Sequence, residues 1–157
     1  MMTAEQRFAV YDLYAHYAST ADACRFDDWL NLFAPICSYR IISRENYAAG
    51  MPLCLMLCES RDMLIDRIVS LQRANEYAIH VDRHMISGIR VTQVQGDLLS
   101  VEANFLVGQT NSEGELSMYV MGSYHDTVQI SDGQAFFVDK KVIVDNGCIP
   151  HAISTPI

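Results

Sequence analysis

The sequence is poor in basic residues. Its 157 residues include 11 Lys and Arg against 19 Asp and Glu, which gives a formal net charge of −8. The basic residues are scattered, and Lys140-Lys141 is the only adjacent pair. Because nucleic-acid binding depends on clustered Lys and Arg that neutralise phosphates, we expect no nucleic-acid partner.

Long apolar runs and targeting signals are also missing. A membrane-spanning helix needs roughly 18 consecutive apolar residues. The most apolar stretch, residues 50–58, is shorter than this and contains Pro52. The N-terminus lacks the basic region and apolar core of a secretory signal. We therefore expect no membrane partner and a cytoplasmic protein.

Recognisable ligand patterns for metals and phosphates are missing too. The five cysteines are an odd number, which suits free thiols in a reducing compartment. Cys54 and Cys58 are spaced like a ligand pair, but no second pair completes a four-ligand zinc site. The sequence also lacks the Cys-x-His and Cys-x-x-His pairs of a Rieske cluster, a glycine-rich phosphate loop and a Gly-x-Ser-x-Gly elbow. We therefore expect this chain to hold no cofactor and no metal.

Helical periodicity dominates the first half of the chain. Residues 4–24 predict a helix with an inward stripe at Phe8, Tyr11, Ala15, Ala18 and Asp22. A short second helix follows, with Trp29, Leu32 and Phe33 inward and Pro35 at its end. Residues 37–44 predict a strand, and 46–58 a loop with some extended backbone. Residues 60–77 predict a third helix, capped by Ser60, whose apolar side includes Met63, Ile65, Ile68, Leu71 and Ala74.

The second half changes to the period of two that is typical of strands. Apolar and polar residues alternate over 99–107, 116–124 and 136–144, and glycine-containing turns at 95–97, 111–115 and 131–134 connect the strands. Helices followed by an antiparallel meander predict an α+β fold. We expect one domain over residues 1–157, a cone in which a strongly curved, mostly antiparallel sheet wraps around the N-terminal helices.

A short His-x-Asp-x-His segment, residues 80–84, marks the entry to this sheet. His80 and His84 stand four residues apart with Asp82 between them. If the strand begins early enough, all three side chains share one face and could hold a metal ion or support acid–base chemistry. The simpler interpretation is that His84 is a hydrogen-bonded strand residue and His80 lies in the entry loop.

Four further polar residues are candidates for the cone interior: Tyr14, His16, Asp22 and Asp28. A buried, unpaired carboxylate is costly. We therefore expect Asp22 either to face a wet pocket or to pair with an Arg or a His. A pocket of Tyr, Asp and His side chains could transfer protons on a small polyketide-like or aromatic substrate. The alternative is that these side chains are satisfied structural groups.

Five motifs make the sequence similar to a known family. They are DDWLNLF (27–33), SYRI (38–41), RHMIS (83–87), YVMGSYHDTV (119–128) and KKVIVDN (140–146). In this order they resemble the small, or beta, subunit of aromatic-ring-hydroxylating dioxygenases, over about residues 21–146. Gly88 and Lys141 depart from the Asn and Arg that many members have there, which leaves the fold intact but the branch of the family open.

The resemblance implies the cone-shaped fold shared with nuclear transport factor 2 (NTF2) and scytalone dehydratase. It implies a structural, non-catalytic subunit in aromatic compound catabolism. Its partner would be a large (alpha) subunit with a Rieske 2Fe-2S cluster and a mononuclear iron that dihydroxylates an aromatic substrate. The implied assembly is a hexamer of three large and three small subunits (α3β3), with the small subunits associating as a trimer. Candidate fold or interface residues are Trp29, Arg83, His84, Tyr124 and Asp126.

Two other functions fit the residues alone. A stand-alone dehydratase, isomerase or cyclase of the SnoaL or scytalone-dehydratase type would use Tyr14, Asp22, His80 and His84. It would need a deep pocket lined by those side chains. A binding module without chemistry would have a dry apolar pocket and no convergent polar groups.

Overall fold

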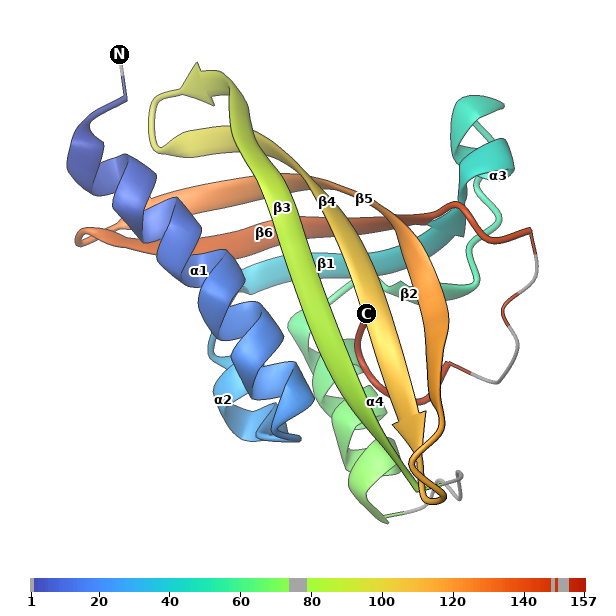
Figure 1. The fold of residues 1–157 in the computed structure, drawn as a ribbon. Helices are drawn as coiled ribbons and strands as arrows, with labels where there is room; N and C mark the ends of the chain where they lie inside the picture. Colours follow the sequence, from blue (N-terminus) through green and yellow to red (C-terminus); the bar gives the residue numbers. More distant parts are fainter. Residues whose placement is uncertain (1, 74–78, 148, 150–152) are drawn as a thin grey trace.

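The protein folds as a sheet with helices packed on one side (Figure 1). The structure is a computed structural model and describes residues 2–73, 79–147, 149 and 153–157. Its elements in chain order are α1 (Ala4–Asp22), α2 (Phe26–Leu30), β1 (Phe33–Ser43), α3 (Arg44–Ala48), β2 (Met56–Cys58), α4 (Arg61–Arg73), β3 (His80–Gln95), β4 (Leu98–Asn111), β5 (Leu116–Ser131) and β6 (Gln134–Val144). The predicted α+β architecture is confirmed.

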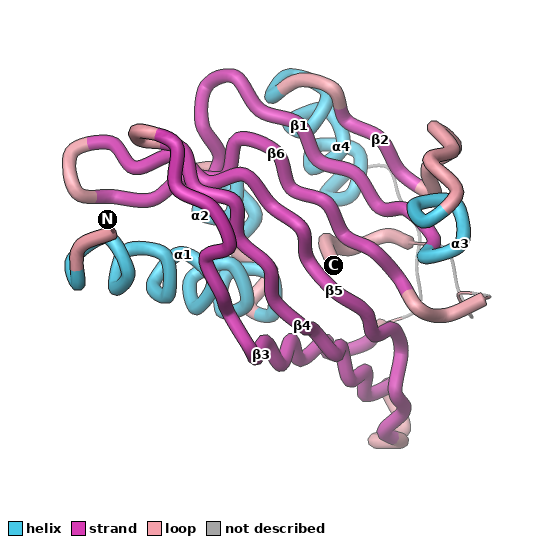
Figure 2. The backbone as a smooth tube through the Cα atoms, turned by 90° about the horizontal axis from the view of Figure 1, so that it is seen from above, coloured by secondary structure: helices cyan, strands magenta, loops and turns pink. Residues whose placement is uncertain are grey.

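The strands form a single sheet in the order β2-β1-β6-β5-β4-β3. Strands β3 to β6 follow one another as an antiparallel meander, and β1 joins β6 in parallel (Figure 2). Figure 1 shows β3 and β4 crossing β1 and β6 at a steep angle, so the sheet is strongly curved. The predicted hairpin turns are also confirmed. In the last of them, Asp132 and Gly133 have φ of 50° and 76°, as a type I′ turn requires.

Helix α1 packs against β3 and β6 with a different face from the predicted one. A capping box between Thr3 and Gln6 fixes its start. Phe8 is 71% exposed, Tyr11 is 43% exposed and Ala15 is also exposed, so the predicted stripe was wrong at these three positions. The buried residues are Val10, Leu13, Tyr14, Tyr17, Thr20 and Ala21. The stripe prediction failed because tyrosines occur on both sides of this helix, and only the ring contacts with the sheet decide which face turns inward.

The connections between the first helices and strands depart from the predictions. Helix α2 ends at Leu30, and Pro35 lies inside β1 instead of ending a helix. The parallel pairing of β1 with β6 is irregular between Phe33 and Ser38, which leaves room for the proline. The predicted loop after β1 contains helix α3, whose N-cap Ser43 accepts a hydrogen bond from Asn46 N.

Helix α4 runs from Arg61 to Arg73, and Ser60 Oγ accepts from Met63 N as predicted. Its buried residues are Leu64, Ile68 and Leu71. Met63 and Ile65 are 42% and 37% exposed, so their predicted inward placement was wrong. Ala74 and the predicted end of this helix lie outside the described residues.

A β-bulge in β3 changes which residues face the helices. Gly88 has a φ of +64°, and the pairing with β4 shifts between Ser87 and Arg90. Ile86 on one side of the bulge and Ile89 on the other both pack against the core. Strict alternation would place Ile86 and Ile89 on opposite faces, so the bulge is what brings both toward the helices.

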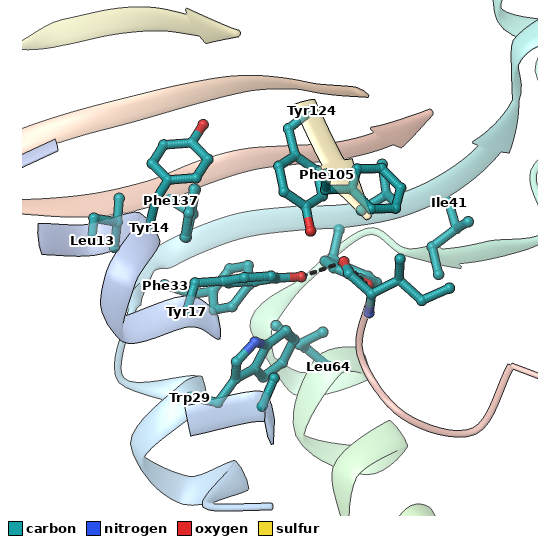
Figure 3. Close-up of a cluster of buried hydrophobic side chains, with 14 of the residues drawn as sticks. Leu13, Tyr14, Tyr17, Trp29, Phe33, Ile41, Leu64, Phe105, Tyr124 and Phe137 are labelled. Atoms are coloured by element: carbon teal, nitrogen blue, oxygen red, sulfur yellow. Dashed lines mark hydrogen bonds between the residues drawn. The ribbon is translucent and has the colours of Figure 1, made fainter. Parts of the chain in front are cut away.

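Aromatic rings fill the space between the helices and the sheet (Figure 3). Tyr17 is central: its ring lies 5.7 Å from Trp29, 6.0 Å from Tyr124 and 5.4 Å from Phe137, measured between centroids. All four side chains are at most 1% exposed. Such ring pairs add to the free energy of burial because their edges and faces carry opposite partial charges. The polar groups described below are embedded in this aromatic core.

Candidate functional site: a polar cone interior

Strand β3 begins at His80, early enough for His80, Asp82 and His84 to share its inner face. Asp82 and His84 are both 7% exposed, while the intervening Val81 and Arg83 point outward. The conditional prediction of a shared face is therefore confirmed. The two histidines nevertheless pair with different carboxylates.

His84 is held by Asp22 from the end of α1. Its Nδ1 lies 2.6 Å from Asp22 Oδ1, and its backbone N donates to both Asp22 carboxylate oxygens at 3.1 Å. Arg83 Nη1 lies 3.8 Å from the same carboxylate, although the Arg83 side chain is 71% exposed. The expectation that Asp22 pairs with an Arg or a His is confirmed. This arrangement fixes the ring orientation of His84.

Asp82 gathers a second set of partners. Its Oδ1 accepts from Gln109 Nε2 at 3.0 Å, and its Oδ2 accepts from Thr155 Oγ1 at 2.8 Å. His80 Nε2 lies 3.4 Å from Asp82 Oδ2. Within residues 2–73, 79–147, 149 and 153–157, no group of three or more His, Cys, Asp or Glu side chains is placed to hold a metal ion. The carboxylates are instead used as hydrogen-bond acceptors.

A third polar group, missed by the sequence reasoning, lies at the centre of the cone. Lys140 on β6 is fully buried, and its Nζ donates to Asp126 Oδ2 at 2.8 Å. Tyr14 Oη donates to the same oxygen, and Lys141 N donates to Asp126 Oδ1 at 3.0 Å. The Lys140 ammonium also lies 3.2 Å from the centroid of the Tyr124 ring, a cation–π contact. Asp126 was predicted as a fold or interface residue, and the structure places it inside the fold.

Burial shifts the pKa of both members of this ion pair. Desolvation lowers the pKa of Lys140 to about 8, although the neighbouring Asp126 opposes the shift. Desolvation likewise raises the pKa of Asp126 above its usual value, against the opposing effect of Lys140. Burial also raises the pKa of Tyr14, Tyr17 and Tyr124 well above the usual value for tyrosine. These tyrosines are neutral hydrogen-bonding groups at neutral pH.

The C-terminal segment enters the cone and contacts Asp82 and two tyrosines of the aromatic core. Ile157 is 1% exposed, and its main-chain oxygen accepts from Tyr17 Oη at 2.6 Å and Tyr39 Oη at 3.2 Å. Ile157 N donates to Tyr39 Oη at 3.1 Å. Figure 1 shows the chain end between α4 and the sheet, and Figure 3 shows the Tyr17 hydroxyl directed at this segment. Residues of the chain itself therefore occupy the cone interior.

The remaining candidates lie apart from one another. His16 is exposed on α1, and Asp28 is exposed and paired with Arg25 at 3.0 Å. Trp29 and Tyr124 are buried among the aromatic rings. The structure thus brings together Asp22 with His84, and Tyr14 with Asp126, but it leaves His16 and Asp28 outside.

Four hollows among the described residues lie away from the Asp22–His84 pair. Asp22, His80 and His84 line none of four hollows formed by the described residues. The groove between α1 and β3, about 600 Å³, has mostly apolar walls and includes only Tyr14 from the predicted catalytic set. The four predicted catalytic residues therefore do not line a common pocket among these hollows.

Replacing Asp22 with Asn should lower the free energy of unfolding by about 2 kcal/mol, because a buried charged acceptor with several donors is lost. Urea unfolding measures this change. The control is Asp28→Asn, which alters an exposed carboxylate and should change stability by less than about 0.5 kcal/mol. Equal stability of the two variants would contradict a structural role for the Asp22–His84 pair.

Comparison with known proteins agrees with the fold. The family model of the SnoaL-like domain matches residues 2–138. The chain therefore belongs to the class of SnoaL-like domains. The predicted cone is consistent with this class. Among described residues, no helix is long and apolar enough to cross a membrane.

Individual relatives identify a more specific family within the SnoaL-like domains. The small subunit of anthranilate 1,2-dioxygenase from Burkholderia cepacia is 35% identical over 150 residues, covering 96% of this chain and 93% of that protein. The beta 1 subunit of the terminal oxygenase component of terephthalate 1,2-dioxygenase from Comamonas is 27% identical and covers 91% and 93%. The beta subunit of an inferred aromatic-ring-hydroxylating dioxygenase from Novosphingobium aromaticivorans superposes with a TM-score of 0.87 at 38% identity, covering 95% of both chains. The chain belongs to the small subunits of aromatic-ring-hydroxylating dioxygenases, as its motifs predicted, and the stand-alone enzyme is not favoured.

Proposed function

We propose that this chain is the structural, non-catalytic small subunit of a cytoplasmic ring-hydroxylating dioxygenase. The filled cone supports this proposal more than any other observation. Side chains and the segment ending at Ile157 occupy the interior, and the buried carboxylates accept hydrogen bonds from neighbouring residues. A catalytic acid or base must reach a substrate within hydrogen-bond distance, and a filled interior denies that access.

The proposed partner is a large subunit that carries the Rieske 2Fe-2S cluster and the mononuclear iron. The names of the relatives at 35% and 27% identity, an anthranilate and a terephthalate dioxygenase, support an aromatic acid as the substrate of the complex. The proposed assembly has three large and three small subunits, with the small subunits arranged as a trimer. In this proposal, the small subunit stabilises the assembly and the large subunit performs the oxidation.

An apolar patch on the outer face of the sheet supports association with the large subunit. Its members come from adjacent positions on β3, β4 and β5: Met85 pairs with Leu106, and Leu106 pairs with Met121. Leu116 and Met118, further along β5, are 78% and 75% exposed. We call the set the outer patch; its residues are Val81, Met85, Leu106, Leu116, Met118 and Met121. Contiguous exposed apolar surface of this kind is typical of protein-binding sites.

Co-expression with the large subunit tests the proposed function. The purified complex should have the mass of a hexamer and should contain iron in proportion to the large subunit. The purified small subunit alone should contain no iron, oxidise no aromatic acid and form a trimer. Iron or oxygenase activity in the isolated small subunit, or a small subunit that stays monomeric with and without the large subunit, would refute the proposal.

A double substitution in the outer patch, Leu116→Lys with Met118→Glu, should weaken association with the large subunit at least tenfold. Fewer than about a third of interface residues contribute more than about 1 kcal/mol each, but two charges placed in an apolar contact must also be desolvated. Co-purification yield and analytical ultracentrifugation measure the loss, while circular dichroism verifies the fold. Ile36→Glu is the matched control, because Ile36 is 88% exposed but lies on β1, beyond β6 from the patch. Equal loss in both variants would contradict the assignment of the outer patch.

A further inference from the structure

We propose that a hollow between β1, β2, α4 and the chain after β6 binds a small carboxylate with an apolar body, and that Arg67 on α4 recognises the carboxylate group. The hollow has a volume of about 460 Å³, which lies within the usual range of small-molecule sites. The inference goes beyond the proposed function, because the site belongs to the small subunit and needs neither the large subunit nor its iron.

Arg67 differs from most basic side chains of this acidic protein. Most Lys and Arg side chains pair with an Asp or a Glu, but Arg67 has no such partner among the described residues. The side chain is partly buried, and its Nη2 donates to the carbonyl oxygen of Ile153. Its Nε is buried without a hydrogen-bond partner in the part of the chain that the structure describes. A guanidinium has five N–H donors, and a buried charged donor left unpaired is costly, so Arg67 is suited to bind an anion.

Arg61 on the same helix has a purely structural arrangement and lies apart from the hollow. Its Nη1 donates to Leu30 O at 2.8 Å and to Phe33 O at 2.7 Å, which connects α4 to the chain between α2 and β1. Arg61 does not line the hollow, whereas Arg67 lines it and makes only one hydrogen bond of this kind within the described residues. The two arginines of α4 therefore have different roles.

The charge of the hollow comes from Arg67. Among the described residues, no acidic side chain lines the hollow. Asp145 is adjacent in sequence to one of the lining residues, but it pairs with Arg44 at 3.7 Å. The Cys58 thiol lies within electrostatic range of Arg67, but burial raises the pKa of this thiol, so it is uncharged at neutral pH. A positive group without a neighbouring negative one favours an anionic ligand.

The other walls of the hollow determine which kind of anion fits. Half of the lining residues have apolar side chains: Leu55, Met56, Ile149 and Ile153. An inorganic anion would leave these side chains in contact with water, whereas an organic acid covers them. The planar guanidinium matches a carboxylate, with which it forms two parallel hydrogen bonds. Ser43 Oγ accepts from Asn46 N, which leaves its hydroxyl hydrogen available to donate to the same carboxylate.

Titration calorimetry of the full chain tests the site, with benzoate as the probe. Benzoate should bind at least tenfold more tightly than inorganic phosphate, which lacks an apolar body, and than benzyl alcohol, which lacks the charge. Hexanoate is the aliphatic counterpart: tighter binding of benzoate would assign the site to aromatic acids, and the reverse order to aliphatic acids. Either order supports the proposal.

Substitution of Arg67 tests its role as the anion-binding group. Arg67→Met should weaken benzoate binding at least tenfold, because it removes both the charge and the paired donors. Arg73→Met is the matched control, since it removes the same charge from an exposed position on the same helix, and should change the affinity by less than twofold.

A second pair of variants leaves Arg67 and its bond to Ile153 in place, so it tests the site even if Arg67→Met does not fold. Leu55→Glu places a carboxylate on the wall of the hollow, where it competes with benzoate for the guanidinium, and should weaken benzoate binding at least tenfold. Leu55 is 54% exposed, so the fold should tolerate the change. Leu53→Glu is the matched control, because Leu53 is 67% exposed on the same loop and does not line the hollow.

Three results would overturn the proposal. They are equal benzoate binding by the unaltered and Leu55→Glu proteins, phosphate binding as tight as that of benzoate, and no binding of either acid at millimolar concentration. None of them affects the proposed function, which is judged by the mass and iron content of the complex with the large subunit.

Discussion

Replacing Lys140 with Met should lower the free energy of unfolding at pH 7 by about 3–5 kcal/mol, the usual cost of removing one partner from a buried ion pair. The substitution leaves Asp126 with hydrogen bonds from Tyr14 and the Lys141 amide but without its cation. It also removes the ammonium from the faces of the surrounding aromatic rings. Urea unfolding, followed by the fluorescence of Trp29, measures the change.

The stability lost in the Lys140→Met variant should depend on pH, and the direction of this dependence tests whether the ion pair is the cause. In the Lys140→Met variant, burial raises the pKa of Asp126 above its ordinary value of 3.8 without opposition from the lysine. The folded state then binds more protons than the unfolded state above about pH 4, so the stability of the variant falls as pH rises.

In the unaltered protein, the pKa of Lys140 is lowered from 10.5 to about 8. Between these values the unfolded state binds the extra proton, so this group makes the protein more stable as pH rises. The deficit of the variant should therefore be smallest near pH 4 and increase toward pH 9.

Two further variants separate the ion pair from simple packing. Lys141→Met changes the adjacent, partly exposed lysine, whose partner is Asp139, and should cost less than about 1 kcal/mol. The double variant Lys140→Met with Asp126→Asn removes both charges and should regain most of the lost stability, since replacing a whole buried pair is often neutral. A pH-independent deficit in Lys140→Met, or a double variant less stable than the single one, would contradict an ion-pair origin.

The periodicity of the sequence predicted the sheet because each strand has one face that packs on the helices. Alternation located β4, β5 and the three turns, and it placed His80, Asp82 and His84 on one face. It failed where the backbone departs from regular pleating. Between Thr127 and Val128 the β5–β6 register shifts, and Phe137 is buried in place of Phe136, whereas Lys140, Val142 and Val144 keep the regular alternation and are all buried.

The buried ion pair could have been suspected from one signal. Asp126 lies two residues after Tyr124 and two before Val128, in the inward positions of a strand that is otherwise apolar there. A carboxylate at such a position needs a buried cation or several donors. The sequence could not say which cation, because the β5–β6 register that brings Lys140 to Asp126 joins two separate strands, and alternation within each strand does not give it. The C-terminal segment gave no periodic signal, since its position depends on contacts with Tyr17, Tyr39 and Asp82, far away in the chain.

Gly122→Ala should be the most disruptive small substitution in the sheet, lowering the free energy of unfolding by about 4 kcal/mol, near the upper end for single substitutions. A Cβ at this position would lie 1.9 Å from the carbonyl oxygen of Ile143 and 3.1 Å from Val144 Cα. Both atoms belong to the backbone of β6, which pairs with β5 at this point. Rotation of a side chain cannot relieve the contact, so the two strands must separate. For a chain of this length the melting temperature should fall by roughly 8–16 °C.

Gly108→Ala is the matched control for this prediction. Gly108 lies on the neighbouring strand β4, and a Cβ there would meet only Leu116 Cδ1 at 3.8 Å and Ser117 O at 4.0 Å, which are ordinary contacts. It should change the free energy of unfolding by less than about 1 kcal/mol. Similar melting temperatures for the two variants would show that β5 and β6 are not as close at Gly122 as described.

The close approach of β5 and β6 at Gly122 also links the two faces of β5. Met121 beside it belongs to the outer patch, and Tyr124 and Asp126 after it face the cone. If β5 must move away from β6 to accommodate the methyl group, the Gly122→Ala variant should lose the Lys140–Asp126 contact and the association with the large subunit together, whereas the outer-patch double variant should lose only the association.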